Sequence, residues 1–236
     1  MSKKKRIVVF TGAGVSADSG IATFRDADGL WANYRIEEVC TPEALKNNRA
    51  KVIDFYNMRR KESLTKKPNE GHIAIAKLEQ WADVCVITQN VDNLHEQAGS
   101  TRVLHLHGEL MKLRSEENPE LIYDINEGWE QSLDERGEDG ALLRPHIVFF
   151  GEDVPMFELA SRIVEHAAVL IGVGTSLAVY PAAALLYFMR DEEVPIYLVD
   201  PGTPDISMIH NPLTHIKERG AVGVPRLVEQ LCKELS

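Results

Sequence analysis

The sequence predicts an α/β protein: a doubly wound, parallel Rossmann-like sheet with a small second domain inserted into it. Short apolar runs recur along the chain, and most are continuous rather than alternating, as is typical of parallel strands covered on both faces. Helix-like segments lie between several of these runs, which is the pattern of a doubly wound sheet. The expected strands are residues 7–10, 84–87, 103–106, 147–150, 169–173 and 196–199, and the expected helices are residues 70–81, 155–166, 181–190 and 224–235.

The composition is that of an ordinary globular protein. The chain has 236 residues, 44% hydrophobic and 26% charged, which is enough to bury a full core. A formal net charge of −10 argues against a protein that coats nucleic acid. No stretch approaches the roughly 18–20 apolar residues that span a membrane. The three cysteines, Cys40, Cys85 and Cys232, lie far apart, as expected in a reducing compartment. We therefore expect a cytoplasmic protein that binds neither a membrane nor nucleic acid directly.

Two regions interrupt the alternation of strands and helices. Residues 36–64 have a helical pattern and lie within the first crossover. Residues 114–143 are acidic, with ten Asp and Glu residues and only scattered apolar ones. We expect the two insertions to pack together as a small helical domain, so that the Rossmann-like domain comprises residues 1–35, 65–113 and 144–236. The cleft between the two domains is the natural place for a substrate.

The stretch 7–31 predicts a site for a pyrophosphate. Its apolar run leads directly into a glycine turn, in which Gly12, Gly14 and Ala17 occupy the small-residue positions of a G-x-G-x-x-G/A fingerprint. Small residues let the backbone approach the ligand, and free N–H groups at a helix start face the anion. Taken alone, the pattern is also compatible with a strand, a turn and a helix that bind nothing.

Three further expected strands end in polar residues. In a doubly wound sheet these ends meet at one edge, where they and the glycine turn would surround a single dinucleotide. Amides and carboxylates suit ribose hydroxyls and a carboxamide, whereas glycines and small hydroxyls suit phosphates. The residues at these ends are Gln89, Asn90 and Asp92 after the second strand, His107 after the third, and Gly174, Thr175 and Ser176 after residues 169–173.

These motifs resemble, in order and in spacing, the successive signatures of the sirtuins, the NAD-dependent protein lysine deacylases. They are GAGVSADSGIATFR, TQNVDNLH, HGEL, the FGE at residues 150–152, and GTSLAVYPAA. The resemblance extends from about Arg6 to Leu235. It implies NAD as the cofactor and an acylated lysine of a protein or peptide as the substrate. The implied reaction transfers the acyl group to ADP-ribose and releases nicotinamide and O-acyl-ADP-ribose.

The resemblance also implies roles for individual residues. His107 would be the general base that draws a proton from the ribose hydroxyls, with Asn90 and Asp92 as the other catalytic residues. Imidazole suits this role because its unperturbed pKa of about 6.5 leaves much of it neutral. His105 and His95 would be structural. The expected NAD contacts are Gly12, Ala13, Gly14, Ser16, Ala17, Phe24, Arg25, Gln89, Asn90, Asp92, His107, Gly174, Thr175, Ser176, Asp200 and Ala221, of which Asp200 departs from the Asn that is common in the family.

The segment 51–63 indicates which acyl group is removed. On a helical wheel, Phe55, Tyr56 and Arg59 share a stripe, which places Arg59 on the buried face while Arg60 reaches water. An inward guanidinium requires an anionic partner, although Arg59 could instead snorkel toward a nearby carboxylate. Tyr56 and Arg59 match the Tyr-x-x-Arg pair of the class III sirtuins. The resemblance implies that this pair binds the carboxylate of succinyl-, malonyl- or glutaryl-lysine.

The substrate groove follows from the same resemblance. Ala27 matches the small residue that widens the acyl pocket of class III, which implies desuccinylase and demalonylase activity with some deacetylase activity. The substrate peptide would add as a strand between two segments of the chain. Val148 and Phe24 line the acyl tunnel or belong to the core; the sequence leaves both open. The expected substrate contacts are Ala27, Tyr56, Arg59, Val148, Gly151, Glu152, Leu177 and Val179.

One family feature is missing from the sequence. Most sirtuins hold a structural Zn²⁺ with four cysteines of the small domain, but residues 111–144 contain no cysteine, and Ser115 stands about where the first ligand would be. The carboxylates of this region lack the spacing of a tetrahedral site. We therefore expect no metal and a small domain that is held by packing and is the least stable part of the chain.

Two other functions are compatible with the same residues. An NAD glycohydrolase or ADP-ribosyltransferase would use the same pocket, but it would consume NAD without an acylated peptide. A non-catalytic NAD-sensing module would need the pocket but not His107, Asn90 and Asp92, so their presence argues against it. A nicotinamide dehydrogenase is disfavoured because the matched motifs describe glycosidic-bond chemistry.

Overall fold

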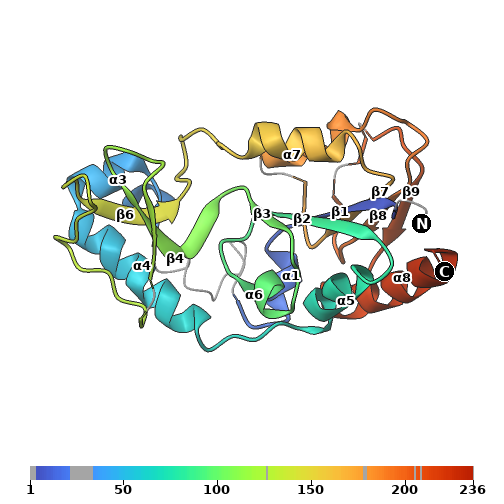
Figure 1. The fold of residues 1–236 in the computed structure, drawn as a ribbon, viewed down its shortest axis with the longest axis horizontal. Coiled ribbons are helices and arrows are strands. Elements are labelled where there is room, and N and C mark those ends of the chain that lie inside the picture. The colour runs from blue at the N-terminus through green and yellow to red at the C-terminus, as the bar shows by residue number, and fades with distance from the viewer. Residues whose placement is uncertain are drawn as a thin grey trace.

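The computed structural model describes residues 4–21, 34–125, 127–177, 180–204, 206–207 and 209–235, which contain two β-sheets (Figure 1). None of the described helices is both long and apolar enough to cross a membrane. The larger sheet is parallel, with the strand order β3 (Val103–His105), β2 (Asp83–Thr88), β1 (Arg6–Thr11), β7 (Val169–Val173), β8 (Ile196–Val199) and β9 (Leu213–Ile216).

Helices cover both faces of the parallel sheet, which confirms the predicted fold class. Figure 1 shows α7 on one side of the strands and α5 and α8 on the other. Alternate side chains of β1 enter the two layers: Ile7 and Val9 pack with α5 and α8, whereas Val8 and Phe10 pack with α7 and η2. The covering helices are α5 (Glu70–Leu78), α7 (Phe157–Val164), the 3₁₀ helix η2 (Ala182–Phe188) and α8 (Gly220–Leu235), and two short helices, α1 (Gly14–Ala17) and α6 (Leu94–Gln97), follow β1 and β2.

Five of the six expected strands are present in the parallel sheet, with ends that differ by no more than one residue. The strand expected at residues 147–150 is wrong. Only its first residue belongs to a strand, β6 (Leu143–Ile147), and that strand lies in the other sheet. After Ile147 the backbone forms hydrogen bonds with residues outside any strand: the Val148 N–H donates to the His107 carbonyl, and the Phe150 N–H donates to the Cys40 carbonyl. An apolar run of four residues does not reveal such a change of partner.

The second sheet belongs to a small module, by which we mean the helices of residues 36–64 together with the three antiparallel strands packed on them. Its sheet has the order β5 (Ile122–Asp124), β4 (Gly108–Ser115), β6. The expectation of a helical module is therefore wrong for residues 114–143. β4 begins before this range, and β6 ends after it. β4 carries two buried apolar side chains, Leu110 and Leu113, and Leu110 joins the apolar cluster of the helices. The helices are α2 (Ile36–Val39), α3 (Pro42–Asn47) and α4 (Arg49–Ser63).

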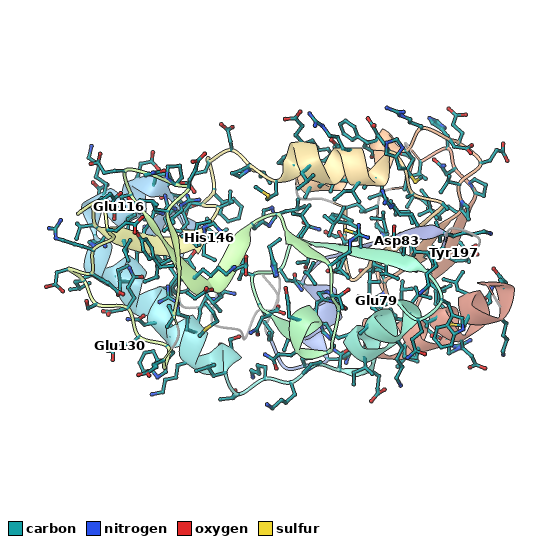
Figure 2. The ribbon with its side chains drawn as sticks, viewed as in Figure 1. Glu79, Asp83, Glu116, Glu130, His146 and Tyr197 are labelled. Carbon is teal, nitrogen blue, oxygen red and sulfur yellow. The ribbon has the colours of Figure 1, made fainter. Side chains whose placement is uncertain are left out.

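The parallel sheet and the small module lie at opposite ends of the long axis. Figure 2 shows Glu116 and Glu130 at the end formed by the module, and Asp83 and Tyr197 toward the other end. His146, on β6, lies nearer the middle. The carboxyl ends of the central parallel strands therefore face the module, and the site lies between them.

Candidate active site

A cavity of about 700 Å³ lies between the carboxyl ends of the parallel strands and the small module. Both parts of the molecule contribute to its wall. The predicted site residues that line it are Gly12, Ala13, Gly14, Ser16, Ala17, Tyr56, Arg59, Gln89, Asn90, Asp92, His107, Val148, Gly151, Glu152, Gly174, Thr175, Ser176 and Asp200.

Two predicted residues do not line the cavity. Leu177 has a left-handed backbone (φ 54°), and its buried side chain joins the apolar layer under α7 and η2. Ala221, in the first turn of α8, follows the wall residue Gly220 and donates its N–H to Asp18. Four further residues lie outside the described part of the chain: Phe24, Arg25, Ala27 and Val179.

The glycine turn packs directly on the loop that follows β7. The Gly14 N–H donates to the Gly174 carbonyl over 2.9 Å. A Cβ atom added at Gly14 would lie 2.6 Å from the Gly174 Cα, and one at Gly12 would lie 2.8 Å from the Gly174 oxygen. Side chains at these positions would push the two loops apart. The glycines are therefore required for the contact between the loops as well as for the approach of a ligand.

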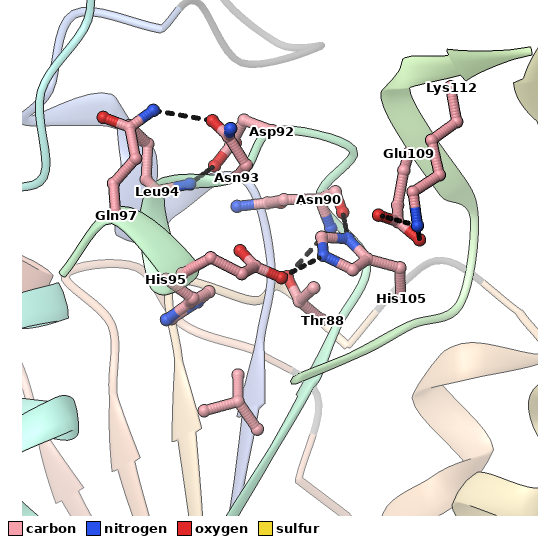
Figure 3. A network of polar contacts seen from close by, with 12 residues as sticks. Thr88, Asn90, Asp92, Asn93, Leu94, His95, Gln97, His105, Glu109 and Lys112 are labelled. Carbon is pink, nitrogen blue, oxygen red and sulfur yellow. Dashed lines mark hydrogen bonds and ion pairs between the residues drawn. The ribbon is translucent and has the colours of Figure 1, made fainter. Parts of the chain in front are cut away.

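Ser16 holds the loop after β2 against the glycine turn. Its hydroxyl donates to Asp92 Oδ2 and accepts from Asn90 Nδ2, each over 3.1 Å, and the Asn90 amide also donates to the Gly12 carbonyl. The second oxygen of Asp92 accepts the Leu94 N–H at 3.1 Å, at the start of α6 (Figure 3). Burial raises the pKa of Asp92, and the hydrogen bonds from Leu94 and Ser16 offset this only in part. Both oxygens of the carboxylate are thus engaged in holding the loop.

His107 lies in the wall of the cavity, between β3 and β4. Its Nδ1 lies 3.0 Å from the Gln89 carbonyl oxygen. Because a carbonyl can only accept a hydrogen bond, Nδ1 carries the proton and Nε2 is the basic nitrogen. Burial lowers the pKa of His107, which the hydrogen bond to Gln89 counteracts only in part. The ring is therefore neutral near pH 7 and able to accept a proton at Nε2.

Tyr56 and Arg59 reach the same cavity from α4. Tyr56 is 1% exposed, its ring stacks on that of Phe149, and its hydroxyl lies 3.3 Å from the Cys40 sulfur. Burial raises the pKa of Tyr56 well above its ordinary value, so its hydroxyl remains protonated. The Arg59 guanidinium lies 5.9 Å from the centre of the Phe55 ring. The cavity thus presents a phenol and a guanidinium on one helix.

The prediction that Arg60 reaches water is wrong, because Arg60 is fully buried and Arg59 is partly exposed. Arg60 donates to the Leu110 carbonyl and to Asn57 Oδ1, each over 2.8 Å, and to Gln131 Oε1 over 3.4 Å. Burial lowers the pKa of Arg60 to about 10. α4 is covered by the cavity wall on one side and by the three-stranded sheet on another, so its buried arc is broader than the single stripe of a surface helix.

Glu152 lines the cavity but its carboxylate pairs within the module. It accepts from Arg144 at 2.6 Å, from Arg114 at 3.2 Å and from the Phe149 N–H at 2.7 Å. Burial acts against the charged form, but these partners outweigh it and lower the pKa of Glu152. Glu152 therefore fixes the turn that leads into Gly151, on the cavity wall.

Sequence reasoning missed several residues of the wall. Glu62 lies three residues after Arg59 on α4, so helical spacing could have found it. Arg219 and Asp18 pair at 3.0 Å although 201 positions separate them, and no local pattern reports such a contact. The missed residues include Asp18, Ile21, Ile36, Cys40, Glu62, Ser63, Val154, Tyr180, Pro181, Pro201, Gly202, Arg219 and Gly220.

Residues 12–181 match the Sir2 family model. The chain belongs to the Sir2 family. It is 50% identical over 233 residues to an NAD-dependent protein deacylase of Bacteroides thetaiotaomicron, which covers 96% of this chain and 98% of that protein. The family resemblance seen in the motifs is therefore confirmed.

Solved Sir2 structures share the fold. A Sir2 homologue in complex with NAD superposes with a TM-score of 0.86 at 37% identity, over 99% of this chain and 91% of that one. A Sir2 variant bound to a deacetylated p53 peptide and 3′-O-acetyl ADP-ribose has a TM-score of 0.81 at 30% identity, over 97% and 94% of the two chains. The first contains the cofactor, and the second contains a peptide and an acylated ADP-ribose.

Proposed function

We propose that this Sir2 protein is an NAD-dependent protein lysine deacylase, which transfers the acyl group of a lysine to ADP-ribose and releases nicotinamide. One observation carries the proposal: His107, whose Nδ1 is bound to the Gln89 carbonyl so that Nε2 is its basic nitrogen, lines the same cavity as the glycine turn, Asn90 and Asp92. The name of the relative from Bacteroides thetaiotaomicron supports the same activity.

The residues of the wall fit NAD. Gly12, Gly14 and Gly174 leave room for a ligand to approach the backbone, and Thr175 and Ser176 add small hydroxyls, which suits a pyrophosphate. Gln89 donates to Thr175 over 3.2 Å, which links the loops after β2 and β7. When bound, NAD supplies a ribose carbon that is open to attack once nicotinamide leaves.

The residues of this chain then have distinct tasks. His107 accepts a proton at Nε2 from a ribose hydroxyl, which makes that oxygen the better nucleophile. Asn90 presents its amide from a loop that Ser16 fixes, and Asp92 acts by holding Ser16 and the start of α6. The acylated lysine would enter between Gly151 and the loop after β7, beside Val148.

The variant His107→Ala tests this function. We expect it to lose acyl transfer by about 10²–10⁴-fold, because it removes the general base, while it still binds NAD. Mass spectrometry of the products from an acylated peptide and NAD is the measurement, and His166→Ala, an exposed histidine at the end of α7, is the control. Undiminished turnover would refute the role of His107, and NAD consumption without peptide would favour a glycohydrolase.

We also propose that the enzyme prefers succinyl- and malonyl-lysine to acetyl-lysine. Tyr56 and Arg59 line the cavity together, and Arg60, the neighbouring cation, is engaged by Leu110 and Asn57. A phenol and a guanidinium suit a carboxylate, since each charge-assisted hydrogen bond contributes about 1.5–3 kcal/mol.

The preference is tested by Arg59→Met, with Lys61→Met as the control for an exposed cation on the same helix. We expect kcat/KM on a succinyl peptide to fall by about 10–100-fold, and on an acetyl peptide by less than about threefold. An equal loss on both peptides would contradict the role of Arg59 and leave the deacylase function in place.

Two further proposals concern the molecule as a whole. We propose that the small module folds without a metal ion, since residues 111–144 contain no cysteine and Ser115 is engaged in hydrogen bonds. We also propose that the protein acts in the cytoplasm, because Cys40, Cys85 and Cys232 form no disulfide, as expected of a reducing compartment.

A further inference from the structure

A second buried histidine, His105, binds two acceptors at once. Its Nδ1 lies 2.8 Å from the Asn90 carbonyl oxygen, and its Nε2 lies 2.9 Å from Glu96 Oε1 (Figure 3). A carbonyl and an ionised carboxylate can only accept. An imidazole donates from both nitrogens only when it is protonated on both, so this geometry holds His105 as the imidazolium.

The charged state of His105 depends chiefly on Glu96. The side chain of His105 is 6% exposed, and burial alone would lower its pKa. The hydrogen bond to Glu96 and the charge of Glu96 outweigh burial and raise the pKa of His105. In turn, His105 helps to lower the pKa of Glu96, although burial of that carboxylate acts in the opposite direction. The two groups form a half-buried ion pair between β3 and α6.

Other titratable groups around His105 contribute less. Glu109 on β4 favours the charged ring, but it is itself paired with Lys112 at 3.0 Å. Asp92, after β2, also feels the charge of His105. His95 on α6 is neutral, because burial lowers its pKa well below the ordinary value. Removal of Glu96 is therefore the change that most weakens the charged form of His105.

His105 and His107 bind consecutive carbonyls of one loop. His107 donates to the Gln89 carbonyl, and His105 donates to the Asn90 carbonyl. The side-chain amide of Asn90 is held from the other side by Ser16. Asn90 is thus fixed at both its backbone and its side chain, and the backbone contact is the one made by a charged donor.

We propose that His105 and Glu96 are a positioning pair for the deacylation site, in which the charged ring of His105 holds the Asn90 carbonyl and so keeps the Asn90 amide in place. The proposal rests on the proposed deacylase function and deepens it. The reaction then requires His107 to be neutral and His105 to be charged at the same pH.

The two requirements have opposite signs. Below the pKa of His107, which is lowered, the base is protonated and activity falls. Above the pKa of His105, which is raised, one donor to Asn90 or Glu96 is lost and activity falls again. The dependence of kcat/KM on pH is therefore bell-shaped, with an acid limb from His107 and an alkaline limb from His105.

The test is Glu96→Gln, because the glutamine oxygen can still accept from His105 while the negative charge is removed. We expect the alkaline limb to move down by about one pH unit and the acid limb to stay in place. The ring ¹⁵N shifts of His105 should titrate at the same lowered pH. Glu158→Gln, which removes an exposed ion pair on α7, is the control and should leave both limbs unchanged.

A second variant covers the case in which Glu96→Gln folds poorly. His105→Gln can never carry the charge, so we expect kcat to be lower by about tenfold across the pH range and the alkaline limb to disappear. The proposal is overturned if the wild-type ring is neutral at pH 7 by ¹⁵N shifts, or if His105 titrates lower in Glu96→Gln while the alkaline limb does not move. If the wild type turns over no acylated peptide, the proposed function fails. In that case the pair is tested by the affinity for NAD: the proposal predicts that this affinity falls as His105 loses its proton, and an affinity that does not change with this titration contradicts it.

Discussion

The parallel sheet and the small module are stabilised by different kinds of interaction. In β1 every residue from Ile7 to Thr11 is buried, and its apolar side chains enter two large apolar layers. The module has one smaller apolar cluster, centred on Phe55, Tyr56 and Phe149. Burial of apolar area is non-directional, so the sheet depends on how much surface it covers.

Guanidinium groups organise the module instead. Arg60 donates to the Leu110 carbonyl, Arg144 to the Ile147 carbonyl and to Glu152, and Arg49 to the Leu133 carbonyl. Arg144 also stacks on the Phe149 ring, 4.0 Å from its centre. A segment with few apolar residues is thus held by directional contacts from long side chains to main-chain oxygens. The contacts of Arg60 and Arg144 are costly to break singly, because each leaves a buried carbonyl without that donor.

The largest effect is expected in the sheet. Phe10→Ala removes a fully buried ring from the layer under α7 and η2, and we expect it to lower the free energy of unfolding by about 3–5 kcal/mol. Urea denaturation followed by circular dichroism measures the loss. Hydrogen exchange should accelerate in the module as well as in the sheet, because the module has no comparable core of its own. A loss of protection confined to β1 and its neighbours would contradict this dependence.

A smaller and more local effect is expected in the module. Arg60→Met keeps the length of the side chain but removes the donor that Arg60 provides to the Leu110 carbonyl and to Gln131 Oε1, and one of the two donors to Asn57 Oδ1. We expect a loss of about 2–4 kcal/mol in the stability of the module. Hydrogen exchange should accelerate in β4 and β6 while β1 and β7 keep their protection. Arg162→Met on α7, an exposed arginine, is the control and should change stability by less than about 0.5 kcal/mol. Equal acceleration in both sheets would show that the two regions unfold together.

The same contrast explains what the sequence could predict. Strands such as Val169–Val173 are continuous apolar runs. This sequence pattern and the position of these strands inside the sheet have the same cause, which is burial on both faces. The loops at their ends, with Asn90, Asp92 and His107, were found because a parallel sheet gathers its carboxyl ends at one edge. β4 and β5 were missed because guanidinium contacts replace much of the apolar periodicity on which such predictions depend.

Arg60 is the most instructive failure. Helical periodicity placed Arg59 inside and Arg60 outside, because the pattern treats a charged residue beside an apolar stripe as solvated. The periodicity of the helix holds no information on Gln131, which is 71 positions away in the sequence and accepts a hydrogen bond from the buried Arg60. The sequence likewise gives no sign of the partners of His105, since Glu96 and Asn90 come from other elements.

The smallest effect is expected from a chelator. Ser115 stands about where a zinc-binding cysteine would be, and its hydroxyl donates to Asp139 at 2.5 Å and accepts the N–H groups of Glu117 and Asn118. These bonds close the turn between β4 and β5. If the module holds no metal, as we propose, EDTA should change Tm by less than about 1 °C, compared with several degrees for a structural zinc site. Elemental analysis of the purified protein is the companion measurement, and stoichiometric zinc or a large drop in Tm would contradict the proposal. If the chelator leaves Tm unchanged while Arg60→Met lowers it, the arginine contacts stabilise the module in the way that zinc does in most of the family.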